Sequence, residues 1–325
     1  MKSTADTTQL LVSATINIAP FIDYCENHRL DWRTAANECD LPTDIMTSEG
    51  WLPSQDLLKF LAAINKHFGY DVAIQVGRLV TVRQLSVALD DALKHCDNLA
   101  EGIAVLIDEM PTLNNHVTFW VEKDEQHWWL CHRGSARPHL PGFEESEWFR
   151  TLALINFCRL FLGQSWRPSK AKLVSSNKNE DKLPPHFKLS NIEFSQVFGA
   201  INVPLADDYQ LLNYAKNTPQ WHQSIVKLIN TYAILPWFNI EWFAALLGMT
   251  SRTLQRNLKQ KQIIFSEVRD SARKKMAVEL LKDKRVSIED VAWQLGYNDL
   301  SNFNRAFKKW YRMTAPTYRR NITTQ

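Results

Sequence analysis

The sequence has few cysteines, no long apolar run and no apolar stretch near its start. Its five cysteines are an odd number, contain no C-x-x-C pair and all precede residue 160, which argues against a disulfide framework and for a reducing compartment. No run of 18 apolar residues is present, so no membrane span is expected. The first residues, Met-Lys-Ser-Thr-Ala-Asp, lack the apolar core of a signal peptide. We therefore expect a cytoplasmic protein without a membrane partner.

Charge is distributed unevenly over a chain that is long enough for two domains. The 325 residues, 45% of them hydrophobic, can supply a core for each domain. From Pro219 to the end there are 18 lysines and arginines against 8 aspartates and glutamates, whereas residues 1–218 contain 20 basic and 27 acidic residues. A basic C-terminal module of this kind attracts phosphate backbones whatever their sequence.

The last hundred residues contain the same helix-turn-helix pattern twice, in residues 239–258 and 287–307. Each copy opens with a helix-capping residue, places a small residue where two helices would cross, and then has a glycine that ends the first helix. These residues are Asn239, Ala244 and Gly248 in the first copy and Ser287, Ala292 and Gly296 in the second. A glycine turn that joins two short helices is typical of DNA-binding motifs whose second helix enters the major groove.

The second helix of each copy has an apolar stripe and an outward arginine. After the caps Thr250 and Asp299, apolar residues fall at the fourth and eighth positions, and arginine falls at the sixth. Between the copies, residues 266–283 are expected to form one long helix that both small domains pack against. Its predicted apolar face consists of Val268, Ala272, Met276, Leu280 and Leu281. A rigid spacer predicts contact with two successive major-groove segments, about 10 bp or 34 Å apart.

With these features the sequence resembles the AraC/XylS family of bacterial transcription regulators from about Gln223 to Arg320. The resemblance is carried by Leu254-Gln-Arg256, the helix from Arg269 to Leu281, Gly296-Tyr, Phe307-Lys-Lys-Trp310 and Tyr318-Arg319. Three positions depart from the family pattern: glycines are usual near Gln262 and Arg312, and the proline usual at Ala315 stands at Pro316. A non-glycine residue in a left-handed conformation costs on the order of 1 kcal/mol.

Residues 15–205 more loosely resemble the arabinose-binding-type N-terminal domain of the branch that includes ornithine-utilisation regulators. The similar features are Gly77-Arg-Leu, residues 84–95, the strand pair around Phe119 and Trp129, and Trp166-Arg-Pro168.

Position on the second helices, together with the family resemblance, assigns roles in DNA binding. Arginine can pair with guanine, and asparagine or glutamine can pair with adenine. The base-contacting candidates are Arg252, Gln255, Arg256, Ser301, Asn302, Asn304 and Arg305. The phosphate-contacting candidates, which would position the protein without reading sequence, are Thr250, Ser251, Thr253, Lys259, Lys308, Lys309 and Arg319. Trp293, Tyr297 and Trp310 are interpreted as core of the second small domain.

The N-terminal half is expected to be helical to about residue 110, with helices at 54–67, 82–95 and 98–110. A hairpin is predicted next, with strands at 116–122 and 127–131, then a helix at 147–162 and a short strand near 172–174. A sheet beside helices can hold a small effector. Candidates to line its site are Phe119, Trp120, Trp128, Trp129 and Phe157; the alternative is that these aromatic residues are simply core.

One short segment suggests different chemistry. Cys131-His132-Arg133 is similar to the Pro-Cys-His-Arg motif of alkylated-DNA methyltransferases, although Leu130 replaces the proline. A metal site from His127, Cys131, His132 and His139 is the other alternative, but adjacent residues of a strand point to opposite faces. We expect neither a metal nor any other cofactor.

The sequence therefore predicts a mainly α protein with a small α+β effector domain in residues 1–205, a linker in 206–218, and an all-α double helix-turn-helix module in 219–325. We expect a sequence-specific transcription regulator, an effector-responsive activator rather than an enzyme. Its expected partners are double-stranded DNA, RNA polymerase, a small-molecule effector and a second copy of the chain. The alternatives are an alkyl-transfer or metal-dependent enzyme that uses the Cys131 region, and an architectural protein with little sequence preference.

Overall fold

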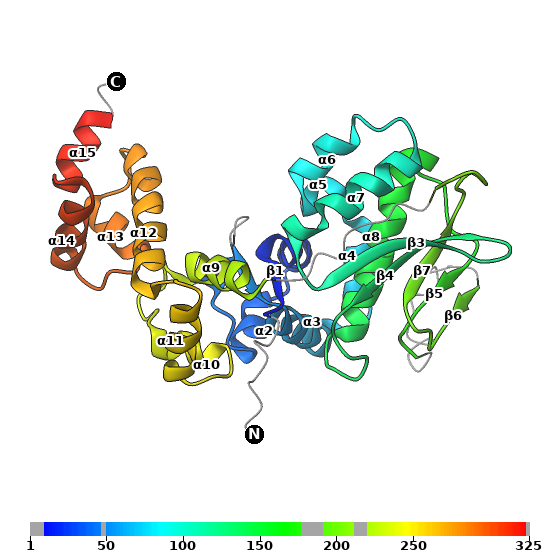
Figure 1. The fold of residues 1–325 in the computed structure, drawn as a ribbon, viewed down its shortest axis with the longest axis horizontal. Helices are drawn as coiled ribbons and strands as arrows, with labels where there is room; N and C mark the ends of the chain where they lie inside the picture. Colours follow the sequence, from blue (N-terminus) through cyan, green and yellow to red (C-terminus); the bar gives the residue numbers. More distant parts are fainter. Residues whose placement is uncertain (1–9, 47–49, 177–190, 211–219, 323–325) are drawn as a thin grey trace. The chain divides into compact units, whose positions relative to one another are not determined.

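The computed structural model describes residues 10–46, 50–176, 191–210 and 220–322 (Figure 1). By their internal contacts, Gln9–Pro219 form one compact unit, the N-terminal unit, and the residues from Gln220 onward belong to a second, the C-terminal unit. Most of the predicted linker, residues 211–218, lies outside the described residues. The expected fold class is confirmed: helices dominate, a small sheet is present in the N-terminal unit, and the described C-terminal unit is all α. None of the described helices is both long and apolar enough to cross a membrane.

The N-terminal unit begins with a two-stranded ribbon and a group of helices. Strand β1 (Val12–Ala14) pairs antiparallel with β2 (Trp51–Pro53), and the 3-10 helices η1 and η2 follow β1 and precede β2. The bounds of the short and long helices here are η1 Thr15–Asn17, α1 Ala19–Asn27, α2 Trp32–Glu38, η2 Thr43–Ile45, α3 Ser54–Phe68 and α4 Val72–Leu79. Phe21, Phe60 and Ile64 are among the fully buried side chains of their common core.

The helix predicted over residues 82–95 is two helices. α5 (Val82–Leu85) ends at Ser86, which has extended backbone angles and caps α6 (Val87–Leu93) by accepting a hydrogen bond from Leu89 N at 3.1 Å. The prediction of one helix was wrong because the serine hydroxyl starts a new helix where the apolar spacing continues. The next helix, α7 (Leu99–Leu113), was predicted and extends three residues further than expected.

A five-stranded sheet follows, with strand order β3-β4-β7-β5-β6. The predicted hairpin is confirmed: β3 (Val117–Lys123) and β4 (Trp128–Gly134) pair antiparallel, with Phe119 opposite His132. β7 (Gly199–Val203) pairs antiparallel with β4 and with β5 (Ala171–Lys172), and β5 pairs parallel with β6 (Ile192–Glu193). β4 is buried on both faces from Trp128 to His132 because it is an interior strand with side chains packed on each side.

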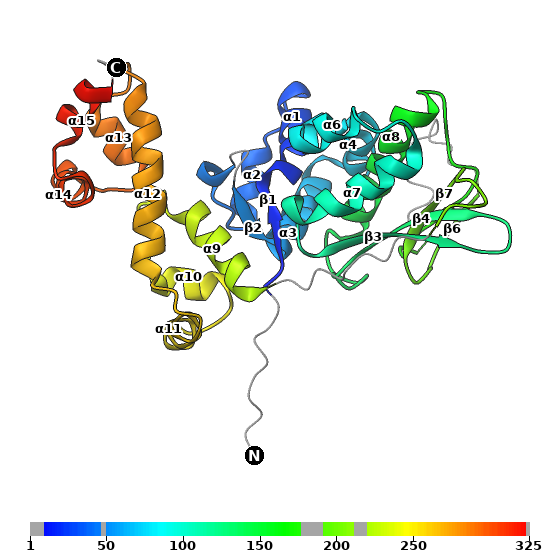
Figure 2. The same ribbon diagram turned by 45° about the horizontal axis from the view of Figure 1, so that its top comes forward.

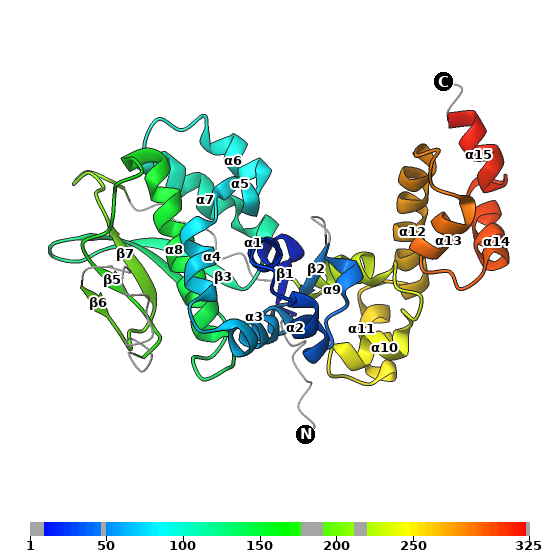
Figure 3. The same ribbon diagram turned by 180° about the vertical axis from the view of Figure 1, so that it is seen from behind.

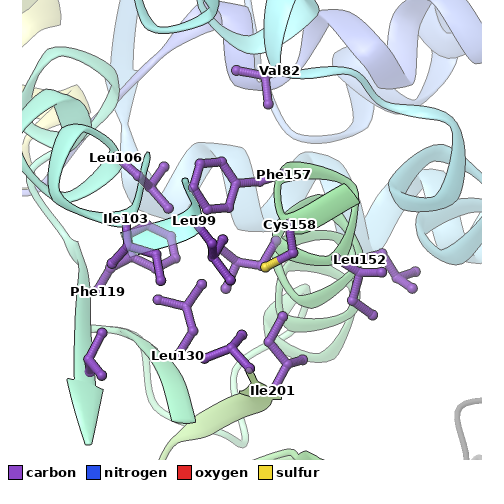
Figure 4. Close-up of a cluster of buried hydrophobic side chains, with 14 of the residues drawn as sticks. Val82, Leu99, Ile103, Leu106, Phe119, Leu130, Leu152, Phe157, Cys158 and Ile201 are labelled. Atoms are coloured by element: carbon purple, nitrogen blue, oxygen red, sulfur yellow. The ribbon is translucent and has the colours of Figure 1, made fainter. Parts of the chain in front are cut away.

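The core of the N-terminal unit lies between the sheet and α8 (Phe143–Leu162), which α4 and α7 also contact. Figure 4 shows Phe157 and Cys158 of α8 with Ile103 and Leu106 of α7 and Phe119 and Leu130 of the sheet. Seen from behind, α4 runs beside α8 (Figure 3). This arrangement leaves the other face of the sheet to a smaller cluster that includes Trp129 and Cys131.

The C-terminal unit consists of seven helices within the described residues 220–322, arranged around one long helix. Their bounds are α9 Trp221–Tyr232, α10 Ile240–Leu246, α11 Ser251–Gln260, α12 Phe265–Lys282, α13 Ile288–Gln294, α14 Leu300–Tyr311 and α15 Ala315–Ile322. Within this unit, α9 contacts α12, and α13 and α15 also contact α12 (Figure 2). Helices α10 and α11 form the first helix-turn-helix, and α13 and α14 form the second.

The buried face of the long helix α12 is centred beside the predicted one. Leu281 is buried as predicted and Met276 and Leu280 pack against the core, but the other buried residues are Arg273 and Ala277, which were not predicted. The three buried positions are four residues apart and therefore share a face. The sequence pattern missed the centre of this face because arginine is usually exposed, whereas Arg273 is buried.

Candidate nucleic-acid interface

The second helix of each motif, whose side chains are predicted to contact bases, is its reading helix. The first reading helix, α11, buries one stripe of apolar side chains and exposes the side chains predicted to contact bases. The hydroxyl of Thr250 caps the helix by accepting a hydrogen bond from Thr253 N at 3.2 Å. Leu254 and Leu258, four residues apart, are buried. The predicted base-contacting residues that lie exposed on this helix are Arg252, Gln255 and Arg256.

The second reading helix, α14, has the same design. Asp299 caps it by accepting a hydrogen bond from Asn302 N at 2.7 Å, and Phe303 and Phe307 are fully buried. A row of side-chain hydrogen bonds follows the helix: Asn302 donates to Asp299, and Arg305 donates to Asn302. This row holds the Arg305 side chain along the surface of α14. Of the residues on α14 that are predicted to contact bases, Ser301, Asn302 and Arg305 are exposed and Asn304 is half-buried.

The predicted phosphate-contacting residues fall into three groups. Three lysines are exposed on the reading helices: Lys259, Lys308 and Lys309. The hydroxyls of Thr250 and Thr253 are hydrogen-bonded to each other at 2.9 Å, and Ser251 beside them is half-buried. Arg319 is half-buried, and its Nε donates to Leu281 O at 3.2 Å, which ties α15 to the end of α12. This contact gives Arg319 a structural role within the domain, and its phosphate contact stays a prediction.

Arg273 connects the backbone that follows α9 with the second helix-turn-helix motif, a role that the sequence pattern did not reveal. Its Nε donates to Ala233 O at 2.7 Å and its Nη2 to Leu235 O at 3.4 Å, at the end of α9. Its guanidinium also lies over the ring of Tyr297, 4.8 Å from the ring centre, in the turn of the second motif. Burial lowers the pKa of Arg273 below its usual value. One buried cation therefore holds together the backbone after α9 and an aromatic ring of the second motif.

The turn glycines of the two motifs have similar backbones but different surroundings. Gly248 has a φ of +65° and Gly296 a φ of +74°, so both use the left-handed conformation that ends a helix. A Cβ added at Gly248 would meet nothing within 4 Å, whereas one at Gly296 would lie 2.5 Å from Ile234 O. The turn of the second motif is thus packed directly against the backbone that follows α9.

Two further helix ends have left-handed backbones without glycine. Gln262 has a φ of 56° after α11, and Arg312 has a φ of 60° after α14. These are the two positions where the family resemblance predicted a missing glycine. The strain expected there from the sequence is therefore present at the exit of each reading helix.

One aromatic residue of the second motif was placed wrongly. Tyr297 and Trp310 pack against the core as expected, but Trp293 is 64% exposed. On α13 the buried residues are Val291 and Ala292, and position 293 faces away from them at the helical period.

The Cys131 segment does not form a reactive site. Cys131 and His132 are both buried on opposite faces of β4, and Arg133 is exposed. Burial, with the nearby charge of Glu122, raises the pKa of the Cys131 thiol well above its usual value. Because the thiolate is the nucleophile, a buried thiol of this kind is unreactive. In the described parts of the chain, no three histidine, cysteine or acidic side chains are grouped as metal ligands would be.

The five aromatic residues proposed to line an effector site are separated by the sheet. Phe119 and Phe157 line a cavity in the core of the N-terminal unit. Trp128 is also on the core side of the sheet, where its ring packs edge-on against Tyr209 with ring centres 5.3 Å apart, away from the cavity lining. Trp120 and Trp129 lie with the cluster on the other face. Two of the five aromatic residues therefore line this cavity and three do not, and their role in effector binding stays a prediction.

Comparison with known proteins identifies the C-terminal helices. A family model described as a helix-turn-helix domain matches residues 243–321. An uncharacterised HTH-type transcriptional regulator of Mycobacterium tuberculosis is 34% identical over 94 residues, which cover 29% of this chain and 27% of that protein. The ornithine utilization regulator of Pseudomonas aeruginosa is 35% identical over 81 residues, which cover 25% of this chain and 24% of that protein. The chain thus spans about a quarter of the length of these curated relatives.

A solved structure aligns over a larger part of the chain. The transcriptional regulator CdpR from Pseudomonas aeruginosa is 20% identical with a TM-score of 0.40, covering 94% of this chain and 98% of that chain. Together, the paired motifs of α10–α11 and α13–α14, the exposed reading helices and the match of residues 243–321 lead to one conclusion. The C-terminal unit contains a helix-turn-helix domain similar to those of HTH-type transcriptional regulators.

Proposed function

We propose that this protein is a sequence-specific transcription regulator that reads two successive major-groove segments with α11 and α14. The observation that carries the proposal is that α11 and α14 each present exposed arginine and amide side chains, while both motifs belong to one unit around α12. A fixed spacer suits half-sites about 10 bp apart on one face of the duplex. A single chain would then recognise an asymmetric site.

The exposed side chains suit base recognition at two half-sites. Arg252 and Arg256 on α11 and Arg305 on α14 can each form two hydrogen bonds with guanine, and Gln255 and Asn302 can do the same with adenine. Asn302 must exchange its present bonds with Asp299 and Arg305 to do so. We assign Ser301 and Asn304 to the edges of the second half-site.

The lysines at the exposed ends of the reading helices would bind the phosphate backbone. Lys259 at the end of α11 and Lys308 and Lys309 near the end of α14 are exposed. We add the capping segment Thr250, Ser251 and Thr253, because the start of a helix and its hydroxyl side chains favour phosphate. Such contacts fix the position of the protein on the duplex without selecting sequence.

Selection of binding sites from random DNA at physiological salt tests this proposal. The wild type should enrich two motifs about one helical turn apart, Arg256→Ala should relax only the first, and Arg305→Ala only the second. Each bidentate contact is worth about 1–3 kcal/mol of discrimination. Lys275→Ala is the control, because it removes one exposed positive charge from α12 rather than from a reading helix.

The outcomes separate specific regulation from architectural binding. Loss of preference at one half-site in each arginine variant, with the Lys275→Ala motif unchanged, supports the assignment. Enrichment of no sequence, with binding that simply weakens as salt increases, refutes it and favours an architectural protein.

We further propose that the N-terminal unit makes this binding responsive to a small-molecule effector and that the protein activates RNA polymerase from the cytoplasm, as a single chain or as a homodimer. An effector can shift the protein only by binding one of its states more tightly than the other. Transcription from a promoter that carries the selected site, measured with and without effector, tests this part. An effector that binds but changes neither DNA affinity nor transcription would refute it.

A further inference from the structure

The core of the N-terminal unit contains a cavity of about 110 Å³ that is lined by α7, α8 and β3 and, on its other sides, by residues of β1, η1, α1, α3, α5 and α6. Its walls are mainly apolar and include Leu106, Met110, Phe119 and Phe157. Leu106, Phe119 and Phe157 are seen together in Figure 4. The cavity is close in size to engineered apolar cavities of about 150 Å³ that bind benzene. It therefore has room for a small apolar body.

One charged side chain, Arg150 of α8, lies in this apolar wall. Burial lowers its pKa to about 10, so it remains charged at neutral pH. Among the described residues, no carboxylate lies within 4.0 Å of its guanidinium. The nearby Glu147 uses its carboxylate to accept hydrogen bonds from Val174 N at 2.7 Å and Ser175 N at 2.9 Å. The charge of Glu147 stabilises the Arg150 cation from beyond contact distance, but the guanidinium itself still lacks a carboxylate in direct hydrogen-bonding contact among the described residues.

The orientation of Arg150 is fixed from one side. Its Nε donates to His132 Nδ1 at 3.0 Å, so the neutral imidazole carries its proton on Nε2. That proton is donated to Thr151 Oγ1 at 3.0 Å, and Thr151 in turn donates to Glu147 O at 2.9 Å. Burial, assisted by the charge of Arg150, holds the pKa of His132 well below its usual value. The other contact of the guanidinium is a weak one, from Nη1 to Ser146 Oγ at 3.5 Å, so Nη2 keeps its hydrogen-bonding capacity.

A second polar group in the cavity wall has no partner. The Nε2 atom of His116 is buried and forms no hydrogen bond with any described residue. Burial and the positive charge of Arg150 lower the pKa of His116 to about 3, so its ring is neutral and can donate from Nε2. A buried polar atom without a partner is unfavourable unless a ligand or water satisfies it. Arg150 and His116 therefore offer a cation and a donor to the same space.

We propose that this cavity binds a monoanionic carboxylate whose apolar body is about the size of a benzene ring. The terminal nitrogens of Arg150 would hold the carboxylate, since the guanidinium fork matches its two oxygens. His116 Nε2 would donate a further hydrogen bond, and the apolar walls would enclose the ligand body. A single cation in an apolar cavity compensates one negative charge, which favours a carboxylate over a dianionic phosphate. This assignment rests on the proposed effector response and names the chemistry of its ligand.

Calorimetric titration of the full-length protein with phenylacetate tests the proposal, with phenylacetamide as a neutral ligand of nearly the same shape. Phenylacetate should bind, and phenylacetamide should bind at least about 10-fold more weakly, because a charged hydrogen-bonded group is lost. Arg150→Met should weaken phenylacetate binding by about 10- to 150-fold. The matched control Arg133→Met, on the exposed surface of β4, should leave binding unchanged.

Two further measurements separate ligand binding from a structural role of Arg150. Arg150→Met also removes the hydrogen bond that buried His132 accepts, so the free variant is expected to lose some stability whatever the role of the cavity. Phenylacetate should therefore raise the unfolding temperature of the wild type and leave that of the Arg150→Met variant unchanged. Ala153→Leu, which retains Arg150 but fills the cavity from α8, should abolish phenylacetate binding. Equal binding of the acid and the amide, or binding that survives both variants, overturns the proposal, as does failure of phenylacetate to bind at all.

DNA binding measured in parallel distinguishes the two proposals. If the selected DNA site is bound but phenylacetate is not, the ligand assignment fails and the DNA-binding function stands. If phenylacetate binds through Arg150 but changes neither DNA affinity nor transcription, the carboxylate site stands and the effector response fails.

Discussion

Replacing Gly296 by alanine should destabilise the second helix-turn-helix much more than the equivalent change at Gly248 destabilises the first. Both residues have left-handed backbones, with φ of +74° and +65°, so alanine costs about 1 kcal/mol at either position. At Gly296 the new Cβ would also lie 2.5 Å from Ile234 O and 2.9 Å from the carbonyl carbon of Leu235. These are backbone atoms, which cannot move aside as a flexible side chain would.

The overpacked contact should add about 1–3 kcal/mol at Gly296. The total is then about 2–4 kcal/mol, against about 1 kcal/mol at Gly248, where a Cβ meets nothing within 4 Å. Any shift of the turn also moves Tyr297 away from the guanidinium of Arg273, now 4.8 Å from its ring centre. The two motifs should therefore lose their fixed relation as well as local stability.

Hydrogen exchange on the full-length protein can measure both variants because it reports separately on each group of helices. In the Gly296→Ala variant, the amides of α13 and α14 should exchange about 30- to 900-fold faster, and in the Gly248→Ala variant those of α10 and α11 about 5-fold faster, by the usual conversion of free energy to an equilibrium constant. Equal effects at the two glycines would refute the conclusion that the turn of the second motif is packed against the backbone after α9.

Three other predictions concern strain, pH and reactivity. Gln262→Gly and Arg312→Gly should each stabilise the C-terminal unit by up to about 1 kcal/mol, since they relieve left-handed backbones; slower exchange at the ends of α11 and α14 would show this, and unchanged or faster exchange would contradict it. The pKa values of His116 and His132 are lowered in the folded state, so the unfolded chain binds more protons below its own histidine pKa of about 6.5. The free energy of unfolding should be highest above that pH and should decrease as the pH falls below it, by up to about 1.4 kcal/mol per pH unit for each histidine. Urea unfolding of the wild type at about pH 7 and about pH 5.5 tests this. The midpoint should decrease less with pH in a His116→Gln variant, and a wild-type midpoint that is independent of pH would contradict the prediction. Cys131→Ser should leave DNA-site selection intact, and an alkyl-transfer activity that disappears in this variant would instead restore the enzyme interpretation.

Much of the DNA-binding surface could be predicted because its determinants are local. Helix caps act on N–H groups within three residues, and an apolar stripe at the helical period shows which face of a short helix is buried. Asn239, Thr250, Ser287 and Asp299 are all caps in the structure, as their positions in the sequence indicated. The absent glycine at Gln262 likewise predicted a strained helix end from one residue and its neighbours.

Local pattern was insufficient where a residue's role depends on distant partners. Arg273 looks like a surface residue of α12 until the carbonyls of Ala233 and Leu235, some 40 residues away in the chain, are found around it. Trp293 looks like core until α13 is seen to bury its neighbours instead. The break at Ser86 also escaped prediction, because the apolar spacing continues across it.

The sequence by itself determined two helix-turn-helix motifs, their caps, their exposed arginines and the hairpin at the start of the sheet. Only the tertiary structure decided which glycine is packed against the backbone after α9, which arginine joins that backbone to the second motif, and which aromatic residues meet in the N-terminal cavity. The physical reason is that capping and helical periodicity act over a few residues. A cavity with Arg150 and His116 in its wall instead depends on elements far apart in the chain, whose packing sets burial and therefore charge and protonation.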